Sequence, residues 1–266
     1  MRLFDRVVLS CNEDPKYLEF WPVISMAWQK LFKVNVSLAF LTNREQEDPL
    51  VLKMQEFGDV QVYEPIDGIP QPNLAKVIRH IHAGTYGDER CLINDIDLLP
   101  LQRNYLNNML SRCTGYTLVT TGKDLYKGKE QGKFTMGYLC AMGSVFREIV
   151  NPDQLSYYEL IESWVGLRTF DDKEDISSRI HNESPESFSD ESLWRALMNR
   201  YERPAIHFPR GFTEDQNIDR ANWRVDWDKL KAGHYVESHL PRPYSQNKPL
   251  IDPLLSYIHE MADPTI

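Results

Sequence analysis

The segment Cys91-Leu92-Ile93-Asn94-Asp95-Ile96-Asp97-Leu98-Leu99-Pro100 carries most of the information about the fold. An apolar run leads into Asp-Ile-Asp, and two leucines and a proline follow, which is typical of a short buried strand that ends at two carboxylates. Alternate residues of an extended chain share a face, so Asp95 and Asp97 are predicted to point the same way. Close carboxylates repel each other, and magnesium, manganese or calcium relieves that repulsion. The alternative is an acidic turn without a metal.

Length and composition describe an ordinary globular protein. The 266 residues suffice for one large α/β domain or two small ones, and 42% of them are hydrophobic and 26% charged. The net charge of -9 argues against a nucleic-acid partner bound through its phosphates. The four cysteines form no C-x-x-C pair, so we expect no zinc ribbon, no disulfide framework and a cytoplasmic location. We also expect no secretory and no transmembrane segment.

Strands and helices alternate in the chain before the acidic segment. The pattern predicts strands at 7–9, 34–41 and 60–63, and helices at 17–31 and 50–57. Such alternation is typical of a parallel sheet with helices on its faces. The first strand is expected to open into a loop at Ser10-Cys11-Asn12.

A further predicted helix directly precedes the acidic segment, and Asn73 is expected to cap it. Lys76, Arg79 and His80 fall on one face of this helix, apart from its apolar positions. Two interpretations stay open for this face. It is either a solvated basic surface or a source of cationic donors to phosphates or a nucleotide.

The second half of the chain continues the alternation. It predicts strands at 116–121, 135–142 and 203–208, and helices at 101–110, 143–150, 154–167 and 250–261. Gly137, early in its strand, is consistent with close approach by a ligand. Residues 122–133, rich in lysine and glycine, are expected to form a mobile loop, either a solvated turn or a lid.

An acidic stretch at 169–191 is expected to be an exposed connection that ends at a helix start. Ser189 is the predicted cap of that helix. Asp190 and Glu191 follow it, where acids are favoured by the helix dipole, so they either complete the cap or serve a site. We see no internal repeat and no clean linker, and therefore expect one domain over residues 1–266.

The order of these features resembles that of GT-A type glycosyltransferases. The matching pieces are the first strand with Ser10-Cys11-Asn12, the helix with Asn73, Lys76 and Arg79, the segment 92–97, the glycine at 137, and Asp190-Glu191. The resemblance covers about residues 5–210. It implies an α/β fold: a single GT-A-like (Rossmann-like) domain with a mixed, mainly parallel sheet flanked by helices. Residues 1–100 or so would bind a nucleotide sugar, and about 101–266 would bind the acceptor and form a C-terminal extension.

The resemblance also implies an activity and a site. A sugar would move from a nucleoside-diphosphate sugar, with UDP favoured over GDP, to a hydroxyl of a glycan or glycoconjugate. Mn²⁺ or Mg²⁺ would be held by Asp95 and Asp97, with His239 as the third ligand and His207 as the second choice. Asp190 or Glu191 would be the general base of an inverting reaction, or would position substrates in a retaining one. The implied nucleotide-sugar-binding residues are Ser10, Asn12, Asn73, Lys76, Arg79, Asn94 and Asp95.

Three other interpretations remain. Haloacid-dehalogenase-like phosphatases also use Asp-x-Asp after an apolar strand, but near the N-terminus and with threonine or valine where this chain has Leu99. Nucleotidyltransferases that make nucleotide sugars carry a glycine-rich basic loop after the first strand, unlike Asn12-Glu13-Asp14-Pro15-Lys16. A non-catalytic nucleotide-sugar-binding or glycan-binding relative would keep the fold without turnover.

Overall fold

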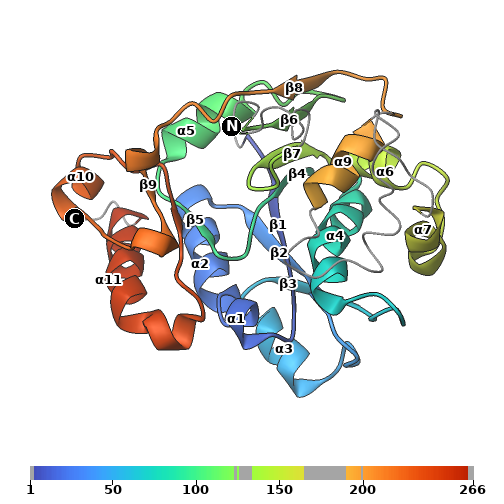
Figure 1. Cartoon of the computed structure of the whole chain (residues 1–266), viewed down its shortest axis with the longest axis horizontal. Helices are drawn as coiled ribbons and strands as arrows, with labels where there is room; N and C mark the ends of the chain where they lie inside the picture. The colour runs from blue at the N-terminus through green and yellow to red at the C-terminus, as the bar shows by residue number, and fades with distance from the viewer. Residues whose placement is uncertain (1–2, 123–124, 126–133, 165–189, 199, 263–266) are drawn as a thin grey trace.

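The computed structural model describes residues 3–122, 125, 134–164, 190–198 and 200–262. Its central sheet has the strand order β3-β2-β1-β4-β7-β6-β8 (Figure 1). The strands are β1 (Arg6–Asn12), β2 (Asn35–Leu41), β3 (Asp59–Tyr63), β4 (Arg90–Ile93), β6 (Leu118–Thr120), β7 (Leu139–Met142) and β8 (Ala205–His207). Strand β7 runs antiparallel to β4 and β6, and the other pairs are parallel. The predicted mixed, mainly parallel α/β sheet is confirmed.

Helices cover both faces of this sheet (Figure 1). One face carries α4 (Gln71–Ala83), α6 (Gly143–Val150), α7 (Tyr157–Ser163) and α9 (Asp190–Met198), and the other carries α2 (Trp21–Phe32), against which α11 (Tyr244–Ala262) packs. The chain also forms α1 (Pro15–Leu18), α3 (Pro49–Gln55), α5 (Arg103–Leu110), α10 (Trp227–Lys231) and the 3-10 turns η1 (Gly84–Tyr86), η3 (Glu214–Gln216) and η4 (Arg220–Asn222). None of the described helices is both long and apolar enough to cross a membrane.

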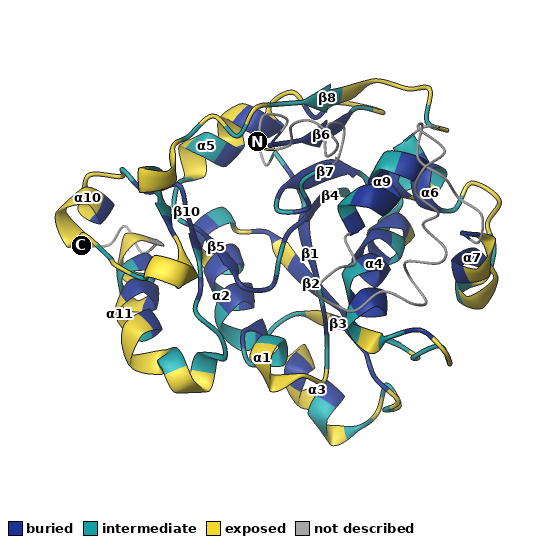
Figure 2. Cartoon of the chain, in the orientation of Figure 1, coloured by how far each residue is buried: buried dark blue, intermediate teal, exposed yellow. Residues whose placement is uncertain are grey.

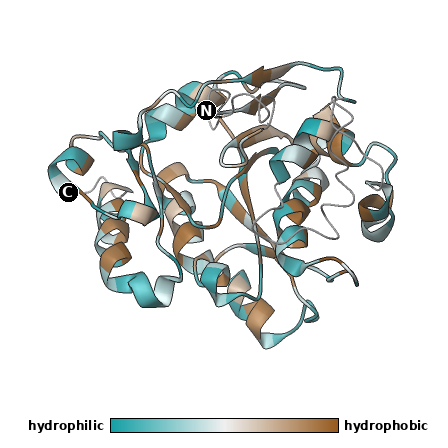
Figure 3. Ribbon diagram, viewed as in Figure 1, coloured by the Kyte–Doolittle hydropathy of each residue, from teal (hydrophilic) through white to brown (hydrophobic). Residues whose placement is uncertain are grey.

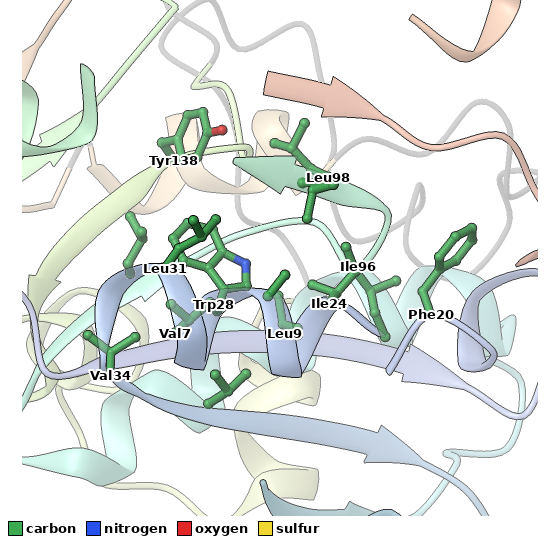
Figure 4. Close-up of a cluster of buried hydrophobic side chains, with 14 of the residues drawn as sticks. Val7, Leu9, Phe20, Ile24, Trp28, Leu31, Val34, Ile96, Leu98 and Tyr138 are labelled. Carbon is green, nitrogen blue, oxygen red and sulfur yellow. The ribbon is translucent and has the colours of Figure 1, made fainter. Parts of the chain in front are cut away.

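Successive side chains of each strand point to opposite faces of the sheet and so enter two separate hydrophobic cores. Val7 and Leu9 of β1 belong to the core beneath α2, whereas Val8 between them belongs to the core beneath α4. Figure 4 shows Val7 and Leu9 beside Ile24 and Trp28 of α2. The central strands β1, β2 and β4 are accordingly coloured mostly as buried in Figure 2 and largely as hydrophobic in Figure 3. A sheet buried on both faces leaves its strand ends as the place where polar side chains can meet a ligand.

A second, small sheet joins the C-terminal part of the chain to the acidic segment. It consists of β5 (Leu98–Pro100), β10 (Glu237–His239) and β9 (Asn217–Ile218), with β10 antiparallel to β5 and parallel to β9. His239 is paired with Leu98 in this register. Strands of two or three residues are too short to leave a periodic pattern, so the sequence did not predict this sheet.

The acidic segment differs from its predicted conformation. Strand β4 ends at Ile93, and Asp95-Ile96-Asp97 lie in a turn closed by a 3.1 Å bond from the Leu98 N–H to the Asp95 carbonyl. The prediction that both carboxylates extend from one strand face is therefore wrong. In the turn, Asp95 contacts α4, whereas Asp97 contacts the C-terminal part of the chain.

Other boundaries differ for local reasons. The predicted helix 17–31 is split into α1 and α2, because Pro22 in the first turn of α2 has no N–H to continue a helix from α1. Strand β1 does not open at Ser10 but stays paired with β2 through Asn12. Helix α4 begins at Gln71 with Pro70 as its N-cap, so Asn73 lies inside the helix and is not the cap.

Several segments are shorter or longer than expected. Helix α7 begins only at Tyr157, after a capping box at Ser156, and α11 begins earlier than predicted, at Tyr244. Gly137 precedes β7 and does not lie in it. The lysine-rich segment 126–133, the acidic segment 165–189 and the predicted cap Ser189 lie outside the described residues.

Candidate active site

A cavity of about 900 Å³ lies at the carboxyl ends of the parallel strands. Its walls come from the end of β1, the first half of α4, the acidic turn, the start of α9 and the C-terminal segment around β9 and β10. Ligands of parallel α/β folds bind at this edge of the sheet. Another cavity, of about 340 Å³, lies between α6, α7 and α9 and contains none of the predicted site residues.

Most of the predicted site residues line the larger cavity: Ser10, Asn12, Lys76, Arg79, Asp95, Asp97, Asp190, Glu191 and His239. Asn73 and Asn94 are fully buried and do not line it. Asn94 donates its side-chain N–H to the Gly137 carbonyl, which ties the end of β4 to the segment before β7. His207 stacks on Phe134 with ring centroids 5.0 Å apart and also lies outside the cavity wall.

Arg79 joins the two acidic parts of the site. Its guanidinium is buried and donates from Nη1 to Asp95 Oδ1 at 2.6 Å and from Nη2 to Asp190 Oδ2 at 2.8 Å. The α4 face that carries Arg79 and His80 is therefore buried, and the interpretation as a solvated basic surface is wrong for these two residues. Lys76, one turn earlier, is partly exposed to the cavity.

Asp190 is an anionic group held by two donors. Burial would by itself raise the pKa of Asp190, but Arg79 and His80 together hold this pKa well below its usual range. A carboxylate with a depressed pKa is a weak proton acceptor. Asp190 is therefore suited to holding Arg79 in place. The adjacent Glu191 is another acid at the cavity wall.

The tautomer of His80 follows from its neighbours. Trp194 Nε1 can only donate, and it lies 2.8 Å from His80 Nδ1, so Nδ1 accepts. The ring proton is then on Nε2, which is 3.3 Å from Asp190 Oδ2. Burial lowers the pKa of His80 to about 4 despite the nearby carboxylate.

We expect the His80 imidazole to stay neutral, with its proton on Nε2, from pH 7.5 down to about pH 5. Nitrogen chemical shifts of the histidine rings, assigned with a His80→Gln variant, measure this directly. Because the unfolded ring binds its proton near pH 6.5, the free energy of unfolding falls as the pH drops from about 6.5 to about 4. A ring that titrates near pH 6.5 in the folded chain would contradict this assignment.

Asp97 is buried and held by two arginines. Its side chain is 7% exposed, with Oδ2 lying 2.5 Å from Arg220 Nη1 and 3.3 Å from Arg242 Nε. Burial and, to a smaller extent, the charge of Asp95 raise the pKa of Asp97. The neighbouring Arg220, Arg242 and His239 act to lower this pKa but do not cancel the rise. Neither Arg220 nor Arg242 was predicted to take part in the site. Arg242 stands three residues after His239 in a Pro- and Arg-rich segment, whereas nothing around Arg220 marks it.

The acidic turn and β10 bring together side chains of the kind that bind a divalent cation. Two carboxylates and an imidazole are a donor set that suits Mn²⁺ or Mg²⁺. His239 Nδ1 is buried and has no hydrogen-bond partner among the described residues, and strand pairing sets His239 next to the turn that carries Asp97. In the described part of the chain, however, no three His, Cys, Asp or Glu side chains are arranged to hold a metal. The donor types therefore suit a divalent cation, whereas in this arrangement arginines hold both carboxylates.

The wall opposite α4 combines aromatic rings with an ion pair. Tyr105 and Phe212 meet edge to face at 5.2 Å, and the Arg210 guanidinium lies 4.4 Å from the Phe212 ring centroid. Arg210 Nη2 donates to the buried Glu237 at 2.8 Å. These residues come from α5, from the loop between β8 and η3, and from β10, so this wall belongs to the second half of the chain.

The fold is the GT-A-like, Rossmann-type fold of glycosyltransferases. A crystal structure of the galactosyltransferase LgtC in complex with donor and acceptor sugar analogs is similar, with a TM-score of 0.52 and 13% identity, covering 97% of this chain and 95% of that one. The glycosyltransferase GlyE of Streptococcus pneumoniae TIGR4 gives a TM-score of 0.44 and 12% identity over 88% of this chain and 54% of that one. The sequence matches no protein-family model and no curated protein. At 13% identity, the likeness to LgtC shows the fold alone.

Proposed function

We propose that the chain is a metal-dependent glycosyltransferase that moves a sugar from a nucleoside-diphosphate sugar, with UDP favoured, to a hydroxyl of a glycan or glycoconjugate. The observation that carries this proposal is the convergence of separate sequence features on one cavity. The end of β1, Lys76, the acidic turn and Asp190-Glu191 all line it, in a fold that the galactosyltransferase LgtC shares. A phosphatase or a non-catalytic relative is the alternative, and both are tested below.

The two halves of the cavity support a division of labour. We assign donor binding to the wall from about residues 1–100, with Ser10 and Asn12 at the end of β1 and Lys76 on α4 facing the cavity. Asn73 and Asn94 are buried behind this wall, so we propose that they maintain the shape of the wall and do not contact the donor. The acceptor would use the wall from residues 101–266, where Tyr105 and Phe212 offer apolar ring surface to a sugar.

Asp95, Asp97 and His239 would hold Mn²⁺ or Mg²⁺. When bound, the ion acts as a Lewis acid toward the diphosphate, which gains negative charge as it leaves. Lys76 adds a positive charge to the cavity wall. His239 Nδ1, buried without a partner among the described atoms, supports its assignment as the third ligand.

The acidic helix start has two tasks in this proposal. The acceptor oxygen bonds to the anomeric carbon, the bond from that carbon to the diphosphate oxygen breaks, and the acceptor proton passes to a base. Asp190 is poorly suited as the base because Arg79 and His80 occupy its carboxylate and depress its pKa. We therefore assign Asp190 to positioning and Glu191 to the acceptor hydroxyl.

We also propose a cytoplasmic location, which the four free, buried cysteines support.

We expect UDP together with Mn²⁺ to raise the melting temperature more than either alone. A ligand that binds only the folded state stabilises it by about 2.7 kcal/mol at 100 times its Kd. A thermal-shift panel of nucleoside diphosphates, each with Mn²⁺ or with EDTA, measures this effect. The proposal fails if no nucleoside diphosphate raises the melting temperature in a metal-dependent way.

Product release distinguishes the glycosyltransferase from the non-catalytic relative and from the phosphatase. With a UDP-sugar that passes the panel, we expect Mn²⁺-dependent release of UDP that increases with a suitable glycan acceptor. Tight binding without any release of UDP would favour the non-catalytic relative. Release of inorganic phosphate from phosphomonoesters would favour the phosphatase.

A further inference from the structure

Two arginines hold the Asp97 carboxylate in different ways. Arg242 is anchored, because its Nη1 donates to the Tyr17 hydroxyl at 2.5 Å and its guanidinium lies 4.8 Å from the Tyr17 ring centroid. Its side chain is 18% exposed. Arg220 donates to Asp97 at 2.5 Å, and its side chain is 37% exposed at the cavity wall. Arg220 donates to no second group among the described residues, so it is the partner of Asp97 that can leave without breaking another contact.

The main chain at Arg220 is held in a capped turn. Arg220 opens the short turn η4, and the Asp219 carboxylate caps this turn by accepting from the Ala221 N–H at 2.7 Å. A rotation of the long Arg220 side chain therefore needs no movement of the main chain. The guanidinium fork suits phosphate as well as it suits carboxylate, so its donors can be satisfied in either place.

A divalent cation and Arg220 make conflicting demands on Asp97. The carboxylate is only 7% exposed, so water screens the charges around it weakly. A cation on Asp97 would share one small, poorly screened space with the positive charge of Arg220. An incoming diphosphate removes the conflict because it offers Arg220 another set of anionic oxygens.

We propose that Arg220 and the divalent cation compete for Asp97, and that Arg220 moves to the diphosphate when the cation binds. This inference rests on the proposed function, because it assumes a cation on Asp97. It goes beyond that function by making cation and nucleoside diphosphate depend on each other for tight binding. By linkage, each raises the affinity of the other by the same factor, and such factors are typically about 5–150-fold.

The test measures Mn²⁺ binding alone, without a nucleotide and without turnover. We expect Arg220→Gln to bind Mn²⁺ about tenfold more tightly than the unaltered chain in an electron paramagnetic resonance titration. Arg224→Gln is the matched control, because Arg224 is exposed four residues further on and its loss changes the net charge equally. Adding Asp97→Asn to Arg220→Gln is expected to abolish the gain, which locates the ion on Asp97. Arg220→Ala repeats the test with a second side chain, and circular dichroism verifies that each variant is folded.

Two failures are distinguishable. If Arg220→Gln and Arg220→Ala bind Mn²⁺ no more tightly than Arg224→Gln, the competition is overturned, whatever the protein binds otherwise. A calorimetric titration of the unaltered chain with UDP, in Mn²⁺ and in EDTA, tests the proposed function on its own. Equal UDP affinity in both media overturns metal-dependent nucleotide binding and the transfer of Arg220 to the diphosphate, while the Mn²⁺ titration still decides the competition for Asp97.

Discussion

Asp97→Asn is expected to lower metal-dependent transfer from a UDP-sugar by about 10²–10³-fold, the range found when one preorganised charge-stabilising group is removed from an active site. The substitution keeps the shape of the side chain and one acceptor oxygen for the arginines around it. It removes the negative charge through which Asp97 would hold a cation. The loss should appear in kcat/KM and be accompanied by weaker Mn²⁺ binding.

The fold is expected to survive this change. Arg220 is partly exposed and can turn to water, and Arg242 keeps its bond to Tyr17. Asp228→Asn is the matched control, since Asp228 is an exposed acid on α10 outside the cavity wall. Full activity of Asp97→Asn with unchanged dependence on Mn²⁺ would contradict the assignment of Asp97 as a metal ligand.

The sequence predicted the fold where side-chain patterns are long. The apolar runs of β1 and β2 and the helical spacing of α2 and α4 each indicate which residues are buried, and these elements appear as expected apart from their ends. The strands β5, β9 and β10 carry too few residues for a pattern. Their pairing nevertheless decides that His239 lies beside the acidic turn.

The site was predictable as a set of residues and not as a set of contacts. Asp95 and Asp190 could be named because acids at a strand end and at a helix start stand out in a sequence. That one buried arginine joins them depends on how α4, the turn and α9 pack, which no local pattern encodes. Arg220 lies 123 positions from Asp97 in an unremarkable stretch, so its ion pair had no sequence signal.

Arg79→Leu is expected to destabilise the protein by about 3–5 kcal/mol, the cost of removing one partner of a buried ion pair. The substitution leaves Asp190, which is 6% exposed, without its main positive neighbour. Asp95 is 37% exposed and can reach water, so we assign most of the loss to Asp190. Urea unfolding of the two proteins at pH 7 gives the difference.

The pH dependence of that difference identifies Asp190 as its source. In the unaltered chain the pKa of Asp190 is depressed, so its stabilising contribution is complete above the ordinary carboxyl pKa of about 4 and is lost as the pH falls through the folded pKa. Without Arg79, burial is expected to raise the pKa of Asp190, so the variant gains stability as this carboxylate takes up a proton. The stability gap should therefore be widest near pH 7 and narrow toward pH 3. Adding Asp190→Asn to Arg79→Leu should recover part of the loss at pH 7.

Arg6 provides a matched comparison because it is an equally buried arginine that pairs with two carboxylates. Its partners Asp59 and Glu89 are 65% and 37% exposed, so both can turn to water when Arg6 is lost. We expect Arg6→Leu to cost less than Arg79→Leu at pH 7 and to show a flatter pH dependence. Equal losses of stability with the same pH profile would mean that Arg79→Leu is destabilised by lost packing of the arginine side chain and not by an unpaired buried carboxylate.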